Sequence, residues 1–159
     1  MPPPYLGNCL CGRVQFQLVA EPLTFYACHC TDCQRRTGGA MLLAMWVERA
    51  ALEVLAGQPE LQVFELRPGR QRRSKVCPNC DTRLWAEPAD RPNLAILRPG
   101  TLLNHKEFEP VAHLYTRSAL PWVVIPQAAA SYATQPDDPQ ELIRLWQEAS
   151  SRRSAQSAT

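Results

Sequence analysis

The spacing of seven cysteines constrains this chain more than any other feature. They form three short motifs, C-x-C, C-x-C-x-x-C and C-x-x-C, at positions Cys9, Cys11, Cys28, Cys30, Cys33, Cys77 and Cys80. An odd number of cysteines cannot all pair within one chain, and the Met-Pro-Pro-Pro start lacks the basic and apolar regions of a secretory signal. The pattern therefore predicts reduced, metal-binding cysteines in a cytoplasmic protein rather than a disulfide scaffold.

Two of the motifs fit a structural zinc site. A tetrahedral zinc takes four thiolates at about 2.3 Å, and two cysteines in a tight turn supply half of that shell. Two such halves are Cys9-Leu-Cys11 and Cys77-Pro-Asn-Cys80. Joined, they make a closed Cys₄ site that ties the N-terminal strand to the middle of the chain. Asp81 follows the second half, where a left-handed backbone is usual, and Asp tolerates that backbone better than most residues.

The remaining motif supplies Cys28, Cys30 and Cys33. Three protein ligands with an open fourth position are typical of a reactive zinc, so we expect two zinc ions per chain, one structural and one catalytic. Three alternatives remain open. The second site is a closed structural zinc with His105 or His113 as its fourth ligand, or it is a redox pair of cysteines. In the third alternative all seven cysteines are buried core thiols that bind no metal.

Short apolar or alternating runs between the motifs predict a mainly β domain. Residues 13–18 alternate so that Val14, Phe16 and Leu18 share one face of a strand. The other predicted strands are residues 23–27, 41–47, 52–55, 61–66, 94–97 and 113–115. Turns rich in Pro and Gly separate these runs, which favours a mostly antiparallel arrangement.

One short helix is predicted near the C-terminus. Asp138 is the expected N-cap and Pro139 the first helical residue. The apolar face at helical spacing consists of Leu142, Leu145 and Trp146. The last ten residues have no apolar anchor. We therefore expect a single zinc-binding domain over residues 1–149, which suits a chain of 159 residues, and a flexible tail over residues 150–159.

The charge and hydropathy of the chain argue against a membrane or nucleic-acid partner. The net charge is only +2, and no apolar run approaches the roughly 20 residues that span a bilayer. Residues 70–75 (RQRRSK) are locally basic and suggest an alternative, a zinc ribbon that binds nucleic acid. The run contains no interleaved aromatic residues, so a solvated hairpin fits it better. A non-catalytic zinc module for a protein partner is the other alternative, and the sequence does not predict an oligomeric state.

The ordered motifs resemble the glutathione-dependent formaldehyde-activating enzyme family, which also contains centromere protein V. The matching stretches are Gly7-Asn8-Cys9-Leu10-Cys11-Gly12, Cys28-His29-Cys30-Thr31-Asp32-Cys33 with Thr37-Gly38, and Cys77-Pro78-Asn79-Cys80. Residues 113–115 and 118–122 are similar to the closing segment of the family. The resemblance covers roughly residues 5 to 126, and the chain departs from it at Asp81, where the family usually has glycine.

The resemblance implies a mainly β, Mss4-like (β-tent) zinc-binding fold. It implies the same two ligand sets, a structural Cys₄ zinc and a second zinc at the three remaining cysteines. It also implies an activity, the joining of formaldehyde to glutathione as S-(hydroxymethyl)glutathione. The enzyme class is a carbon–sulfur lyase, named for the reverse direction.

Three further residues are candidates for this chemistry. A metal-bound thiol is deprotonated, so glutathione would meet the aldehyde carbon as a thiolate. His29 could move a proton to the hemithioacetal oxygen, or it could be a loop histidine that bonds backbone or solvent. Arg35 and Arg36 could bind the carboxylates of glutathione in forked pairs, or they could be solvated surface charges.

Overall fold

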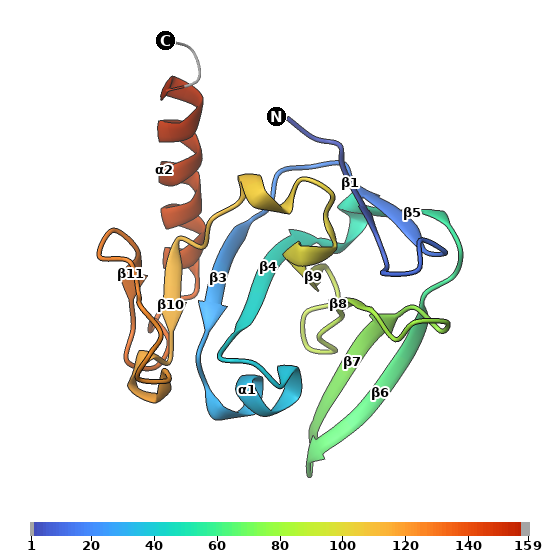
Figure 1. Cartoon of the computed structure of the whole chain (residues 1–159), viewed down its shortest axis with the longest axis horizontal. Coiled ribbons are helices and arrows are strands. Elements are labelled where there is room, and N and C mark those ends of the chain that lie inside the picture. The colour runs from blue at the N-terminus through green and yellow to red at the C-terminus, as the bar shows by residue number, and fades with distance from the viewer. Residues whose placement is uncertain (1, 157–159) are drawn as a thin grey trace. The chain divides into compact units, whose positions relative to one another are not determined.

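A computed structural model of the chain describes residues 2–156 (Figure 1). Contacts between residues in space divide the chain into two compact units. The first unit consists of the chain up to Pro22 together with Met45–Phe108. The second unit consists of Leu23–Ala44 and the chain from Glu109 onward. The first unit is built mainly from strands, the second combines short strands with helices, and each contains one group of cysteines.

A three-stranded antiparallel sheet forms part of the first unit. Its strands are β1 (Tyr5–Asn8), β2 (Gln15–Leu18) and β5 (Leu52–Ala56), in the order β1-β2-β5. Val14, Phe16 and Leu18 are all buried, as their alternation predicts. The Phe16 ring lies 5.6 Å from the ring of Trp85, measured between centroids. Gly7 faces Phe16 so closely that a Cβ at this position would overlap the ring, which fixes glycine before the first cysteine motif.

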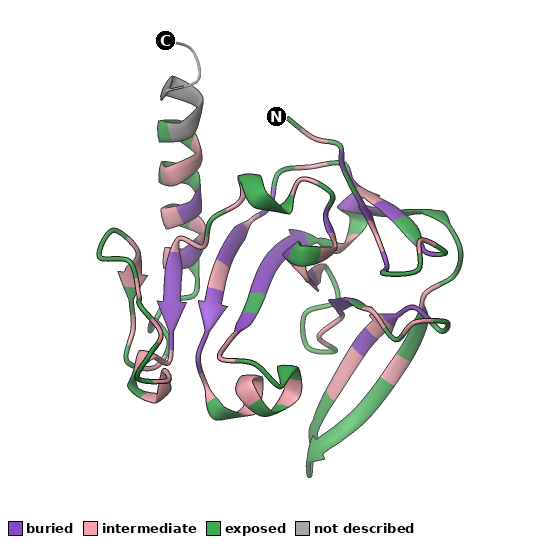
Figure 2. Cartoon of the chain, in the orientation of Figure 1, coloured by how far each residue is buried: buried purple, intermediate pink, exposed green. Residues whose placement is uncertain are grey.

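A second antiparallel sheet completes the first unit. Its order is β4-β9-β8-β7-β6, with β4 contributing residues 45–48 here. The bounds are β4 (Leu42–Glu48), β6 (Glu60–Arg67), β7 (Arg70–Val76), β8 (Arg83–Ala86) and β9 (Leu94–Leu97). Three single-turn 3₁₀ helices join these elements: η1 (Arg49–Ala51), η2 (Pro99–Thr101) and η3 (His105–Glu107). Strand β6 is largely exposed, and β7 is exposed at its start and buried toward its end at Val76 (Figure 2).

The second unit has a parallel core. Strand β10 (Ala112–Leu114) pairs in parallel with β3 (Thr24–Cys28) on one side and with β11 (Ala130–Ser131) on the other. Its helices are α1 (Thr31–Thr37), η4 (Thr116–Ser118) and α2 (Gln140–Gln156). Helix α2 packs on β3, where Trp146 meets Phe25 edge-to-face and the Thr24 hydroxyl donates to the Leu142 carbonyl at 2.8 Å.

The mainly β fold with a C-terminal helix is confirmed, and every predicted strand is present with small shifts at its ends. The mostly antiparallel expectation holds for the first unit but not for β10. Parallel neighbours need a long crossover, and most of the chain lies between β3 and β10. The strands predicted from the sequence do not include β1, β7, β8 (all of the first unit) or β11, and β7 is hidden by its polar composition. Helix α1 is also absent from the prediction, because it has no buried residue to give it an apolar stripe.

Helix α2 starts as predicted and ends later. The Gln140 N–H donates to Asp138 Oδ1 at 2.9 Å, which confirms the N-cap. The sequence predicts a flexible tail from residue 150 after a short helix, whereas the helical backbone continues to Gln156. Arg, Ala and Gln are good helix formers and extend the helix without an apolar face. Residues 157–159 lie outside the described residues, and the flexibility of the tail stays a prediction. The single domain over residues 1–149 also stays a prediction.

Among the described residues, no helix is both long and apolar enough to cross a membrane.

Candidate metal centres and active site

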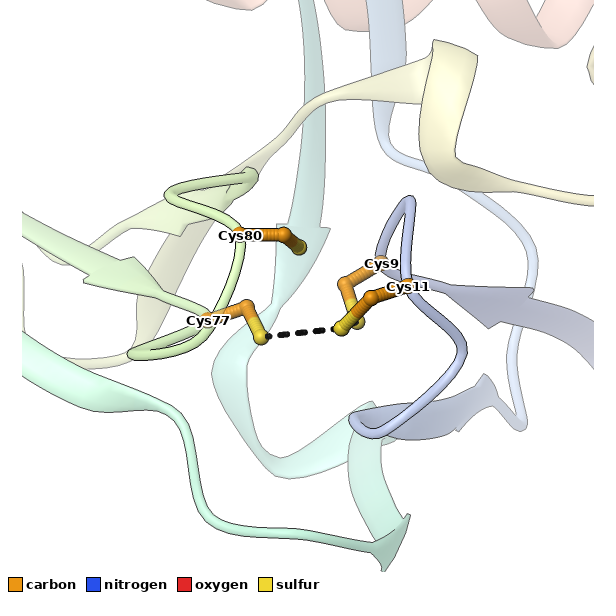
Figure 3. Close-up of side chains that lie close together, drawn as sticks. All are labelled: Cys9, Cys11, Cys77 and Cys80. Carbon is orange, nitrogen blue, oxygen red and sulfur yellow. Dashed lines mark hydrogen bonds between the residues drawn. The ribbon is translucent and has the colours of Figure 1, made fainter.

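The first cysteine cluster joins the two motifs that the sequence pairs. The sulfur atoms of Cys9, Cys11, Cys77 and Cys80 lie within 4.8 Å of one another and point toward one another (Figure 3). Cys9 and Cys11 are 3.5 Å apart at sulfur, and Cys11 and Cys77 are 3.8 Å apart. Thiolates around one tetrahedral zinc lie about 3.8 Å apart, since each is about 2.3 Å from the metal. The spacing therefore fits zinc and is far longer than a disulfide of about 2.05 Å.

The two halves of this Cys₄ cluster are built alike. In the β1–β2 loop the Gly12 N–H donates to the Cys9 carbonyl at 3.0 Å, and in the β7–β8 turn the Asp81 N–H donates to the Cys77 carbonyl at 3.0 Å. Gly12 has φ +74° and Asp81 has φ +54°, so a left-handed residue follows the second cysteine of each half. Asp81 thus adopts the backbone that the sequence predicts at this position, without a glycine to make it favourable.

Thr82 connects the two halves and is a residue that the sequence analysis missed. Its hydroxyl accepts the Leu10 N–H at 3.0 Å and shares a hydrogen bond with the Cys80 sulfur at 3.1 Å. That hydrogen bond lowers the pKa of Cys80 to about 6, although burial opposes the shift. A ligand must be ionised to bind a metal, so Thr82 prepares Cys80 for that role. The sequence does not predict this role for Thr82, because its partner Leu10 lies on a distant segment of the chain.

The second cysteine cluster forms at the junction of β3 and α1. The sulfur atoms of Cys28, Cys30 and Cys33 lie within 4.8 Å of one another. Cys28 ends β3, Cys30 is the N-cap of α1, and the Cys33 N–H donates to the Cys30 sulfur at 3.4 Å. Cys28 is buried, whereas Cys30 and Cys33 are half-buried. Across the described part of the chain, no other cysteine, histidine or carboxylate joins this group.

The acid–base chemistry of this Cys₃ cluster fits a bound cation. A hydrogen bond with Cys33, followed by burial, raises the pKa of Cys28, and burial raises the pKa of Cys30. Crowded thiolates repel one another, and a divalent cation is the group that offsets this repulsion and ionises them. A redox pair is typically associated with a lowered thiol pKa, which neither Cys28 nor Cys30 has. The two clusters could each hold a metal ion, and the donor sets are compatible with zinc.

The alternative in which His105 or His113 is the fourth ligand of the Cys₃ cluster finds no support in the geometry. Neither His105 nor His113 belongs to the Cys₃ cluster among the residues described. The Nδ1 atom of His113 lies 2.9 Å from Nε2 of His29 instead, in a histidine pair. Both rings are buried, with 0% of His29 and 4% of His113 exposed. The sequence places His29 in a loop near substrate or solvent, whereas the structure places its ring in the interior against His113.

The two arginines after the cluster occupy different faces of α1. Arg36 is three residues beyond Cys33, so the two lie on the same face of the helix. Arg35 is exposed and lies on another face, because two residues turn an α-helix through about half a revolution. Arg36 is therefore the arginine better placed to meet a carboxylate near the cysteines.

The basic run 70–75 forms most of β7. This strand is paired on both sides, to β6 and to β8. Successive side chains of a strand point to opposite faces, so the charges are divided between two faces rather than gathered in one stripe. This placement favours the hairpin interpretation over a nucleic-acid surface.

The match to a known protein family agrees with the motifs. The model of the family named glutathione-dependent formaldehyde-activating enzyme matches residues 4–118. The chain therefore belongs to this family, and with both cysteine clusters formed it has the Mss4-like, mainly β zinc-binding fold expected from the resemblance. A crystal structure of a protein from Rhodobacter sphaeroides is similar at 17% identity, with a TM-score of 0.48, covering 80% of this chain and 98% of that one. A comparison with curated proteins finds no significant match.

Proposed function

We propose that the chain is a zinc-dependent carbon–sulfur lyase that joins a thiol, glutathione, to formaldehyde or a similar small aldehyde. The observation that carries this proposal is the Cys₃ cluster, which offers three sulfur ligands and leaves a fourth coordination position for a substrate. Family membership supports the same substrates, formaldehyde and glutathione. The product would be S-(hydroxymethyl)glutathione.

The two clusters have different roles in this proposal. Cys9, Cys11, Cys77 and Cys80 hold a structural zinc, since four ligands close its coordination. Cys28, Cys30 and Cys33 hold the catalytic zinc. Each chain thus binds two zinc ions in a single domain over residues 1–149. Such a protein suits the cytoplasm, where glutathione is abundant and thiols stay reduced.

The reaction conserves electrons and needs no further reactant. Cys28, Cys30 and Cys33 would hold the zinc, which would supply the Lewis acidity that deprotonates a substrate thiol near neutral pH. A carbon–sulfur bond forms between the glutathione sulfur and the formaldehyde carbon, and the carbonyl π electrons move to the oxygen. The proton released by the thiol ends on that oxygen. Cys30 and Cys33 are only half-buried, which supports access of small molecules to the cluster.

In this scheme Arg36 binds a carboxylate of glutathione, and Arg35 is a weaker candidate because it lies on another helix face. His29 has no exposed atom from which to meet substrate, so its part in the proposal is to hold its two neighbouring cysteines in place. The proton transfer first predicted for His29 would require its ring to leave the pair with His113.

The test is the formation of S-(hydroxymethyl)glutathione, followed by NMR against the uncatalysed reaction. The zinc-loaded protein should accelerate it, and Arg36→Ala should raise KM for glutathione by about tenfold, the size expected for one lost charge-assisted hydrogen bond. Arg35→Ala is the matched control and should change KM much less. Cysteamine, a thiol without carboxylates, should react equally well with the protein and the Arg36→Ala variant. A wild-type protein that binds two zinc ions yet gives no acceleration would move the assignment to a non-catalytic zinc module.

A further inference from the structure

The backbone of His29 is held by one short segment, residues 113–118, which we call the clamp. The His29 N–H donates to the Leu114 carbonyl at 2.9 Å, and the His29 carbonyl accepts the Ser118 hydroxyl at 3.1 Å. Gln34 Nε2 donates both to the His29 carbonyl at 2.9 Å and to the Ser118 carbonyl at 2.8 Å. Because the residues on either side of His29 are proposed metal ligands, fixing this backbone also fixes the directions of their side chains.

The ring of His29 is held by the same segment. Its Nε2 atom lies 2.9 Å from Nδ1 of His113, with the two ring planes 19° apart and their centroids 5.2 Å apart. His113 is itself fixed within the parallel sheet, where it stands opposite Ala27 of β3. Its carbonyl accepts the Tyr132 N–H at 2.9 Å. The bond between the rings therefore ties His29 to a rigid point of the second unit.

The histidine pair is costly if its only purpose is packing. The single hydrogen bond between the rings uses one nitrogen of each histidine and leaves the other nitrogen of each ring at the outer ends of the pair. These ends are His29 Nδ1 and His113 Nε2, which are buried and have no hydrogen-bond partner among the described residues. Two aliphatic side chains would fill the same space without this penalty.

A second cost occurs two residues further along the clamp. Tyr115 has φ +58°, a left-handed backbone that is unfavourable for a residue with a Cβ. The turn at Tyr115 leads into η4 and brings Ser118 back to the His29 carbonyl, and the Ser118 hydroxyl also donates to the Tyr115 carbonyl at 3.0 Å. Strained backbone and unsatisfied polar atoms that occur together are typical of a segment kept for function.

We propose that His113 is a positioning residue for the Cys₃ cluster. Its ring bond to His29 sets the orientation of the Cys28–His29–Cys30 segment, so that the three sulfurs converge on one metal. The inference rests on the proposed function for the identity of the ligands. Residues that orient metal ligands without touching the metal commonly contribute about 10- to 100-fold in metal affinity.

The test measures zinc affinity at the two sites by competition with a chromogenic chelator, without substrate. His113→Leu removes the ring bond at similar volume, and His113→Asn keeps a hydrogen-bonding atom near the position of Nδ1. His105→Leu is the matched control, because His105 is an exposed histidine of the first unit. We expect His113→Leu to lower the zinc affinity of the Cys₃ cluster by about 10- to 100-fold. The zinc affinity of the Cys₄ cluster should stay unchanged. His113→Asn should recover most of the loss, and the cobalt absorption spectrum of that one site should follow the same order.

Several results would overturn the inference. One is a folded His113→Leu protein with both affinities unchanged, and another is a loss shared equally by both sites. If His113→Leu does not fold, His113→Asn decides, and a folded Asn variant with one weakened site contradicts the role of the ring bond. A wild-type chain that binds only one metal contradicts the proposed function and this inference together. Two tight metals with no catalysis contradict the proposed function alone.

Discussion

The two cysteine clusters bring sulfur atoms together by opposite means. In the Cys₄ cluster the ligands come from segments 66 residues apart, as in the pair Cys11 and Cys77. The Leu10 N–H joins those segments directly by donating to the Thr82 hydroxyl. In the Cys₃ cluster all ligands lie within six residues of sequence. The clamp holds His29, which lies between Cys28 and Cys30, through both its backbone and its ring.

This difference separates two uses of a metal. Where distant segments meet, the metal is itself the cross-link, so losing it should cost folding free energy. Where the protein already holds the ligands, the metal is free to exchange ligands and do chemistry. The same substitution should therefore have different effects in the two clusters.

The largest effect is expected for Cys80→Ser. Structural zinc contributes about 10–16 kcal/mol in small zinc domains, which is comparable to the whole stability of a typical domain of about 5–15 kcal/mol. The variant should therefore lose cooperative folding, seen as lost near-ultraviolet circular dichroism and collapsed NMR dispersion. Cys33→Ser, the same substitution in the Cys₃ cluster, is the matched control and should stay folded. A Cys80→Ser protein with the thermal transition of the wild type would contradict the division of roles.

The smallest effect is expected for Asp81→Gly. Glycine relieves the left-handed strain at φ +54° but gains freedom in the unfolded chain, so the net stabilisation should be on the order of 0.5 kcal/mol. Thermal unfolding should show a small rise in Tm, and the Cys₃ metal affinity should not change. Asp137→Gly, at an exposed position with a negative φ, should not raise Tm. A fall in Tm for Asp81→Gly would show that the aspartate side chain stabilises the turn.

Local features of the molecule could be read from the sequence. The alternation of residues 13–18, the Asp138 N-cap and the left-handed Asp81 all depend on residues a few positions apart, and each is found in the structure. The grouping of the cysteines into four and three also follows from local spacing and agrees with the geometry.

The supporting residues could not be read from the sequence, because their partners are distant in it. His29 meets His113 across 84 residues and Ser118 across 89, and Leu10 meets Thr82 across 72. Histidine, serine and threonine have no sequence spacing that would predict these long-range hydrogen bonds. Helix α1 was missed for another reason, since it is short and buries none of its residues.

The most direct test of the account is a glutathione titration of the protein loaded with cobalt in place of zinc. The wild type should bind two cobalt ions per chain, and glutathione should change the absorption of one of them, because only the Cys₃ site has a position open to a thiol. The Cys30→Ser variant should remain folded, bind about one cobalt and show no response to glutathione. A wild-type spectrum that ignores glutathione, or a response that persists in Cys30→Ser, would contradict the assignment of the Cys₃ cluster as the reactive centre.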